Sequence, residues 1–279
     1  MVSSTVLGGI LLALLATFLF NISPILQKSG LNEIHEIDFE KVHHSLKKMI
    51  ANKKWTLGLI LGLLGGIPYV IAVNLTGVTI VEPMINTGFI LIAIMAVRYL
   101  KEKIHLWDYI AIFSLIIMPF FLALSNVSRP THDMTLQKTQ IDLLSLTGGM
   151  MIGFFICIYF ARFRPIVWTL ALGLLISLCS IYLQATMSLI MFAGYSFTDD
   201  FSLIIKNLWV DPNLTLAFIT GMIAFVLNFI MMYVYQVGLH RVPASKMIPI
   251  SQTIDNFTTV SAGIWIFGQV IGNWVFYSI

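Results

Sequence analysis

The sequence predicts an all-α polytopic membrane protein, and two observations carry this fold class. Hydrophobic residues make up 58% of the 279-residue chain and charged residues only 10%, which lies far outside the range of a soluble globular domain. The apolar residues also gather into runs of about 20, the number that a helix needs to cross a hydrocarbon core about 30 Å thick. We therefore expect the lipid bilayer as a partner, and neither a cofactor nor a nucleic acid.

Eight of these runs are long enough to span the membrane, and a ninth is short. The first, at about 4–27, has no basic residues before its apolar core and no evident cleavage site, so it is interpreted as a retained span rather than a signal peptide. The ninth begins near Gly272 and stops at Ile279, about half the required length, so the last helix is predicted to be truncated. The remaining spans are expected at about 55–75, 79–99, 106–125, 142–161, 166–193, 213–237 and 244–267.

The basic residues predict the orientation of these spans. Thirteen of the 16 lysines and arginines fall in the odd-numbered connections, and the even-numbered connections hold only Arg129, Lys138 and Lys206. Positive charge favours the cytoplasmic side of a membrane. We therefore expect an integral plasma-membrane protein with its odd-numbered connections in the cytoplasm and its N-terminus outside.

The first connection, residues 28–54, is too polar to cross the membrane. Its apolar residues Val42, Leu46, Met49 and Ile50 recur at helical spacing, which predicts an amphipathic helix near the membrane surface. The histidines and acids of this connection do not have the spacing of a metalloprotease site, so we interpret them as a solvated face.

Two pairs of similar segments predict an internal repeat. Residues 23–27 (SPILQ) resemble 180–184 (SIYLQ), and residues 69–83 resemble 235–249 at an offset of 166. With the predicted orientation, the spans of the two halves run in opposite directions, as in transporters built from inverted repeats. We expect a first four-helix repeat in 1–125, a linker with a central span in 126–165, and a second, inverted repeat in 166–279.

The same segments carry a resemblance to a known family. Residues 20–31 (FNISPILQKSGL), the V-x-P-x-x-x-x-G pattern at 81–88 and the K-E-K triplet at 101–103 are similar to the drug/metabolite transporter superfamily, and most of all to the NIPA-type magnesium transporters. Residues 211–250 resemble the corresponding part of the second half. The resemblance implies an EamA-like fold of nine helices and a transport function. The sequence departs from the family at 268–270 (GQV), where a glutamate usually follows the penultimate helix, and Asp255 matches no family motif.

Asp255 lies where a membrane helix rarely carries a charge. At about 1.5 Å per residue from Ala244, it is roughly 16 Å into the membrane and so near the midplane. A charge at that depth costs at least about 2.5 to 3.5 kcal/mol, which is reduced when the group binds a proton, a cation or water. Helical spacing places Gln252, Asn256 and Thr259 on the same face.

Polar side chains of other spans are expected to converge on the same interior, because they avoid lipid. Instead of binding a cargo, any single amide among them can form an interhelical hydrogen bond that contributes about 0.6 kcal/mol to helix association. The predicted binding residues are Asp255, Asn256, Gln252, Gln184, Asn228, Asn21, Tyr69 and Asn86, with Asp255 as the metal ligand, Glu82 at the outer mouth, and Pro83 and Pro249 as hinges.

These features favour an alternating-access carrier of Mg²⁺ or a related divalent cation, with the ion as substrate. The alternative is a proton-coupled exporter of small metabolites, amino acids or organic cations, in which Asp255 carries the proton. An enzyme is not expected, since the sequence has no HExxH, no G-x-S-x-G and no phosphate-binding glycine loop. A Mg²⁺ site usually has more negative charge than one aspartate provides. A homodimer is one way in which further carboxylates would reach the site.

Overall fold

A computed structural model describes residues 4–34, 42–76, 81, 84–85, 87–102, 106, 109–110, 112–114, 117, 132, 135–195 and 200–269, and every regular element in these residues is a helix. The chain divides into two compact units. The first contains the described residues of Met1–Ser125 together with Leu239–Pro249, and the second contains those of Asn126–Gly238 and Ile250–Asn273.

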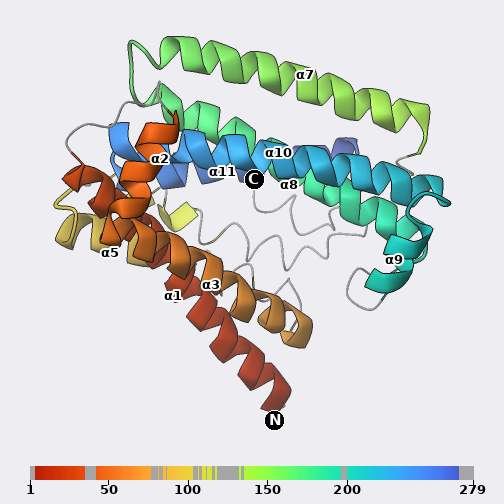
Figure 1. Ribbon diagram of the computed structural model, residues 1–279, viewed down its shortest axis with the longest axis horizontal. Coiled ribbons are helices and arrows are strands. Elements are labelled where there is room, and N and C mark those ends of the chain that lie inside the picture. Colours follow the sequence, from red (N-terminus) through yellow and green to blue (C-terminus); the bar gives the residue numbers. More distant parts are fainter. Residues whose placement is uncertain are drawn as a thin grey trace. The chain divides into compact units, whose positions relative to one another are not determined.

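The first unit is organised around the pairing of α1 (Ser4–Glu33) with α3 (Lys53–Thr76), which lie side by side in Figure 1. Small residues make this approach possible: a Cβ on Gly58 would lie 2.7 Å from the backbone oxygen of Ser23, and a Cβ on Gly62 would lie 2.7 Å from the Ser23 hydroxyl. Glycines spaced four apart are typical of tightly packed membrane helices. The unit also contains α2 (Val42–Ala51) and α5 (Phe89–Arg98).

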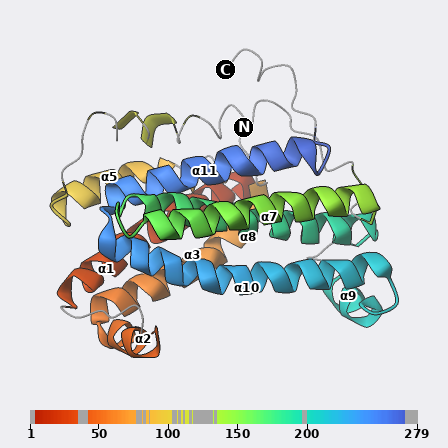
Figure 2. The same ribbon diagram turned by 90° about the horizontal axis from the view of Figure 1, so that it is seen from above.

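The second unit is built on α8 (Val167–Phe192), whose residues are buried on most sides. The helix α7 (Gln137–Phe160) packs along it, and Figure 2 shows the two running together. The short α9 (Phe201–Asn207) precedes α10 (Pro212–Arg241), which is followed by α11 (Ala244–Trp265). The division between the units falls within α10 after Gly238 and within α11 after Pro249.

The described helices confirm an all-helical membrane protein. Four of them, covering Leu7–Glu33, Gln137–Phe160, Val167–Phe192 and Pro212–Arg241, are long and apolar enough to cross a membrane. Large apolar side chains on α7 and α10 are exposed, including Leu144 at 64% and Phe229 at 62%. Such surfaces are stable against lipid rather than water. The inverted arrangement of eight to nine spans stays a prediction.

Three local features differ from the sequence-based expectation. The first helix continues to Glu33, beyond the predicted end at 27. Where one continuous span was expected at 79–99, the described residues Val81, Met84, Ile85 and Thr87 are helical, and a turn at Gly88 separates them from α5, which begins at Phe89. The helix α9 was not predicted, since its seven residues are too few to give a periodic signal.

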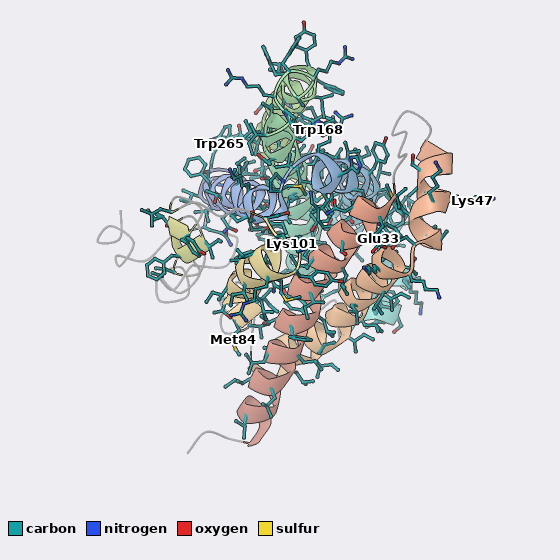
Figure 3. All side chains as sticks on the ribbon, turned by 90° about the vertical axis from the view of Figure 1, so that its left-hand side faces the viewer. Glu33, Lys47, Met84, Lys101, Trp168 and Trp265 are labelled. Carbon is teal, nitrogen blue, oxygen red and sulfur yellow. The ribbon has the colours of Figure 1, made fainter. Side chains whose placement is uncertain are left out.

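The helix predicted in the first connection is present as α2. Met49 and Ser45 are buried inside the unit, whereas Leu46 and Ile50 are exposed. Lys47, labelled in Figure 3, lies on the exposed part of the same helix. Some apolar residues of α2 are therefore buried in the unit, and others face its surroundings.

Candidate functional site

The polar face of α11 is the centre of the candidate site. Asp255 lies at the middle of this helix and is only 7% exposed, while Phe257 on the other side is 73% exposed. The Gln252 Nε2 donates a hydrogen bond to the Asp255 Oδ2 over 3.2 Å. One turn further on, the Thr259 hydroxyl donates to the Asp255 backbone oxygen over 2.7 Å. The predicted stripe is thus on the buried side of the helix, and it holds the carboxylate in place.

The neighbouring helix α8 approaches α11 closely just before the acid. A Cβ on Gly173 would lie 2.8 Å from the Ile254 Cβ, so this glycine permits the contact. Cys179, about two turns along α8 from Gly173, is buried. On α8 itself, the hydroxyls of Ser177 and Ser188 donate to backbone oxygens of their own helix, each over 2.8 Å.

Gln184, a predicted binding residue, lies in a second polar contact of the same unit. Its Nε2 donates to the Gln269 Oε1 over 3.2 Å. Gln269 follows Gly268, whose φ of 60° lies in the left-handed region that favours glycine. The Gln269 N–H in turn donates to the Gly263 backbone oxygen over 2.9 Å, which closes the end of α11.

Asn228 lines a groove between α8 and α10. The groove has a volume of about 370 Å³, and Cys179, Ser180 and Phe225 also line it. Most of its remaining lining is apolar. The structure thus places Asn228 beside the face of α8 that carries Cys179, in a mainly apolar setting.

In the first unit, Asn21 supports the interruption before α5. Its amide nitrogen donates to the backbone oxygens of Thr17 over 2.7 Å and of Ile85 over 3.4 Å. The Thr17 hydroxyl donates to the Met84 backbone oxygen over 3.1 Å. Gly88 is required there, because a Cβ would overlap the Asn21 side chain. These contacts add partners from α1 to the Met84 and Ile85 oxygens, which also accept from the Thr87 hydroxyl and the Gly88 N–H.

The other predicted site residues have separate settings. Tyr69 packs edge-on against Phe20, with ring centroids 6.0 Å apart, as part of the contact between α3 and α1. Pro249 lies inside α11. Asn256 is half-buried next to Asp255. Glu82, Pro83 and Asn86 lie outside the described residues.

Two charged residues that the sequence analysis did not select have well-defined partners. The Lys28 ammonium donates to the backbone oxygens of Leu239 and Val242, and the Glu102 carboxylate accepts hydrogen bonds from the start of α11. Both lie in segments that the sequence analysis assigns to the cytoplasmic connections. The sequence gives only a weak indication of the role of Glu102. The residues at the start of α11, Val242-Pro243-Ala244, include no side chain that could cap the helix, so the cap must come from elsewhere in the chain.

The described residues contain no group of three His, Cys, Asp or Glu side chains that could hold a metal ion. A site on α11 would therefore rely on one carboxylate, amide oxygens, hydroxyls and water. These are the hard oxygen ligands that Mg²⁺ and Ca²⁺ prefer. The geometry suits an ion that keeps much of its hydration shell, or a ligand that exchanges a proton with Asp255.

Two comparisons with known proteins detect similarity. The family described as magnesium transporter NIPA matches residues 4–269 of the chain. A protein from Arabidopsis thaliana, described as probable magnesium transporter NIPA9, is 32% identical over 105 residues, which cover 37% of this chain and 30% of that relative. No solved structure matches the chain significantly.

Proposed function

Since the chain belongs to the NIPA family of magnesium transporters, we propose that it carries Mg²⁺ or a related divalent cation across the membrane by alternating access. The family match and the apolar helices support a transporter rather than an enzyme. The observation that carries the choice of cargo site is Asp255, a buried carboxylate halfway along α11.

The contacts of Asp255 suit a cation-binding role. A Mg²⁺ ion gives up water reluctantly and commonly takes one or two protein carboxylates while keeping several waters. Gln252 orients one carboxylate oxygen, and Asn256, the next residue along α11, is half-buried. We propose that Asp255 supplies the charge and that Gln252 and Asn256 contact the hydration shell. The roles of Gln184, Asn228, Asn21 and Tyr69 in cargo binding stay predictions.

A specific observation favours the second candidate, a proton-coupled exporter of a small organic molecule. The groove of about 370 Å³ between α8 and α10 is lined largely by apolar side chains, among them Phe225. Such a lining is typical of sites for organic ligands and unfavourable for a hydrated ion. In this reading the carboxyl group of Asp255 binds and releases the proton that drives export.

Transport by the purified protein in liposomes tests the first proposal. With a Mg²⁺-sensitive dye inside the vesicles, Asp255→Asn is expected to reduce uptake by about tenfold or more, since a hydrogen bond or contact to a charged group is worth about 1.5–3 kcal/mol. Asp142→Asn on α7 removes an acid from the same unit and serves as the matched control. Uptake by Asp255→Asn at the parent rate would show that the site is elsewhere.

Thermal stabilisation separates the two candidates. A shift of the unfolding midpoint with Mg²⁺ or Mn²⁺ that disappears in Asp255→Asn supports cation transport. A shift with amines or amino acids, combined with proton movement on their addition to vesicles, supports the exporter. The two outcomes require only the purified protein, vesicles that contain it and a panel of ligands.

A further inference from the structure

The turn between α10 and α11 is held by two charged side chains that come from distant parts of the chain. Lys28, on the last third of α1, is only 7% exposed, and its ammonium donates to the backbone oxygens of Leu239 and of Val242, the latter over 2.7 Å. Leu239 is in the last turn of α10 and Val242 directly follows its last residue, Arg241, in the region where carbonyl groups lack helical partners and the helix dipole is negative. A buried ammonium needs such partners, because burial without them is costly.

Glu102 performs the complementary task at the start of α11. One carboxylate oxygen accepts from the Ala244 N–H over 2.9 Å, and the other accepts from the Ser245 N–H over 3.0 Å and from the Ser245 hydroxyl over 2.7 Å. The first N–H groups of a helix lack partners and form a positive dipole end. The negative charge of Glu102 therefore matches this helix end as the positive charge of Lys28 matches the other.

The backbone after α5 aims the Glu102 carboxylate. Lys101, labelled in Figure 3, has a φ of 57°, and the next N–H, that of Glu102, donates to the Ala96 backbone oxygen over 3.0 Å. The end of α11 repeats this turn, with Gly268 at a φ of 60° and the Gln269 N–H donating to the Gly263 oxygen over 2.9 Å. Gln269 thus stands in the second half where Glu102 stands in the first, one residue later than the sequence offset of 166 places it.

Pro249 separates the held turn from the candidate cargo site. The division between the two units falls directly after this residue, so that 239–249 belong with α1 and α5. Proline has no N–H, so the Ser245 oxygen loses its helical partner and α11 is weakened at this point. Asp255 follows six residues later, in the second unit.

We propose that Lys28 and Glu102 are a latch, which holds the α10–α11 turn in one state of the transport cycle and releases it in the other, while α11 bends at Pro249. The latch is on the side that the basic residues predict to be cytoplasmic. At the repeated turn, the neutral Gln269 stands in place of the charged Glu102, and it accepts a hydrogen bond from Gln184. The proposal rests on transport by alternating access, and it identifies which residues control access from one side.

The latch is tested by the accessibility of a buried position just after Pro249. Ser251, 2% exposed, is replaced by cysteine in a chain whose Cys157 and Cys179 are replaced by alanine. The rate of labelling by a small charged thiol reagent is then measured in proteoliposomes without divalent cations. Glu102→Gln or Lys28→Met is expected to raise this rate by about tenfold or more, because a charge-assisted hydrogen bond is worth about 1.5–3 kcal/mol in a two-state equilibrium.

Milder and control variants keep the test decisive. Ser245→Ala removes one of the three hydrogen bonds to Glu102 and is expected to give a smaller rise, even if the charge variants fail to fold. Gln269→Leu alters the repeated turn at the other end and is expected to leave the labelling rate unchanged. The double exchange Lys28→Glu with Glu102→Lys is expected not to restore the parent rate, since each new charge faces the wrong helix end.

Two results would overturn the latch. One is a labelling rate that stays at the parent value in Ser245→Ala and in any folded charge variant, while the unfolding midpoint falls: the contacts are then only structural. The other is recovery by the double exchange, which would mean that the two residues act as a simple ion pair. Neither result depends on Mg²⁺, so the latch can fail while the proposed transport function stands, and the reverse.

Discussion

Replacing Gly58 by alanine is expected to separate α1 from α3. The new Cβ would lie 2.7 Å from the Ser23 backbone oxygen and 2.9 Å from the Gln27 backbone nitrogen. Since ordinary contacts begin at 3.4 Å and backbone atoms cannot rotate away, the helices must move apart by about 0.7 Å. Overpacking of this kind costs about 1–3 kcal/mol. Gly66→Ala is the matched control, because nothing lies within 4 Å of its Cβ position.

The difference in the free energy of unfolding between the two variants measures the steric cost of the new Cβ between α1 and α3. Both gain helix propensity, about 1 kcal/mol for glycine to alanine, so this contribution cancels in the difference. Gly58→Ala should therefore be less stable than Gly66→Ala by about 1–3 kcal/mol. Titration of the protein from mild micelles into sodium dodecyl sulfate, followed by far-ultraviolet circular dichroism, measures both free energies of unfolding. Equal free energies would refute the close approach of α1 and α3 and, with it, the role of the glycines.

Three further predictions concern single contacts. Gly173→Ala is expected to lower the unfolding midpoint and to weaken any stabilisation by cations, because its Cβ would lie 2.8 Å from the Ile254 Cβ; a second change, Ile254→Ala, should recover both, and no recovery would contradict the contact. Gln269→Leu should reduce the free energy of unfolding by about 0.5–1.5 kcal/mol through loss of the hydrogen bond to Gln184, and an unchanged value would mean that water replaces it. Lys54→Met should leave the unfolding midpoint unchanged, since the ion pair with Glu33 is about half exposed; a clear drop would show that this surface pair matters.

The predicted membrane class and most helix positions follow from local sequence. Runs such as 142–161, 166–193 and 213–237 agree with α7, α8 and α10 to within a few residues at most ends. Apolar length is a property of a single segment, so it can be read without knowing what the segment contacts. The same holds for the polar face of α11, because helical spacing alone placed Gln252 beside Asp255.

Other features depend on partners far away in the chain. At the turn of Gly88, Asn21 and Thr17 of α1 donate hydrogen bonds to the carbonyl groups before it, and no local pattern around Gly88 reveals these partners. The predicted cargo residue Gln184 finds its partner in Gln269, 85 residues away. Periodicity shows which face of a helix is polar but says nothing about which helix lies opposite.

The sequence by itself determined that this protein is a bundle of apolar helices in a membrane and that Asp255 lies midway along one of them. Only the tertiary structure decided what the charged residues outside that site do. In the sequence, Lys28 and Glu102 look like any other charged residues of the cytoplasmic connections. In the structure, each binds one end of a helix more than 140 residues away. The physical reason is that unpaired groups at helix ends accept any partner of suitable charge, so folding, and not spacing, chooses which side chain reaches them.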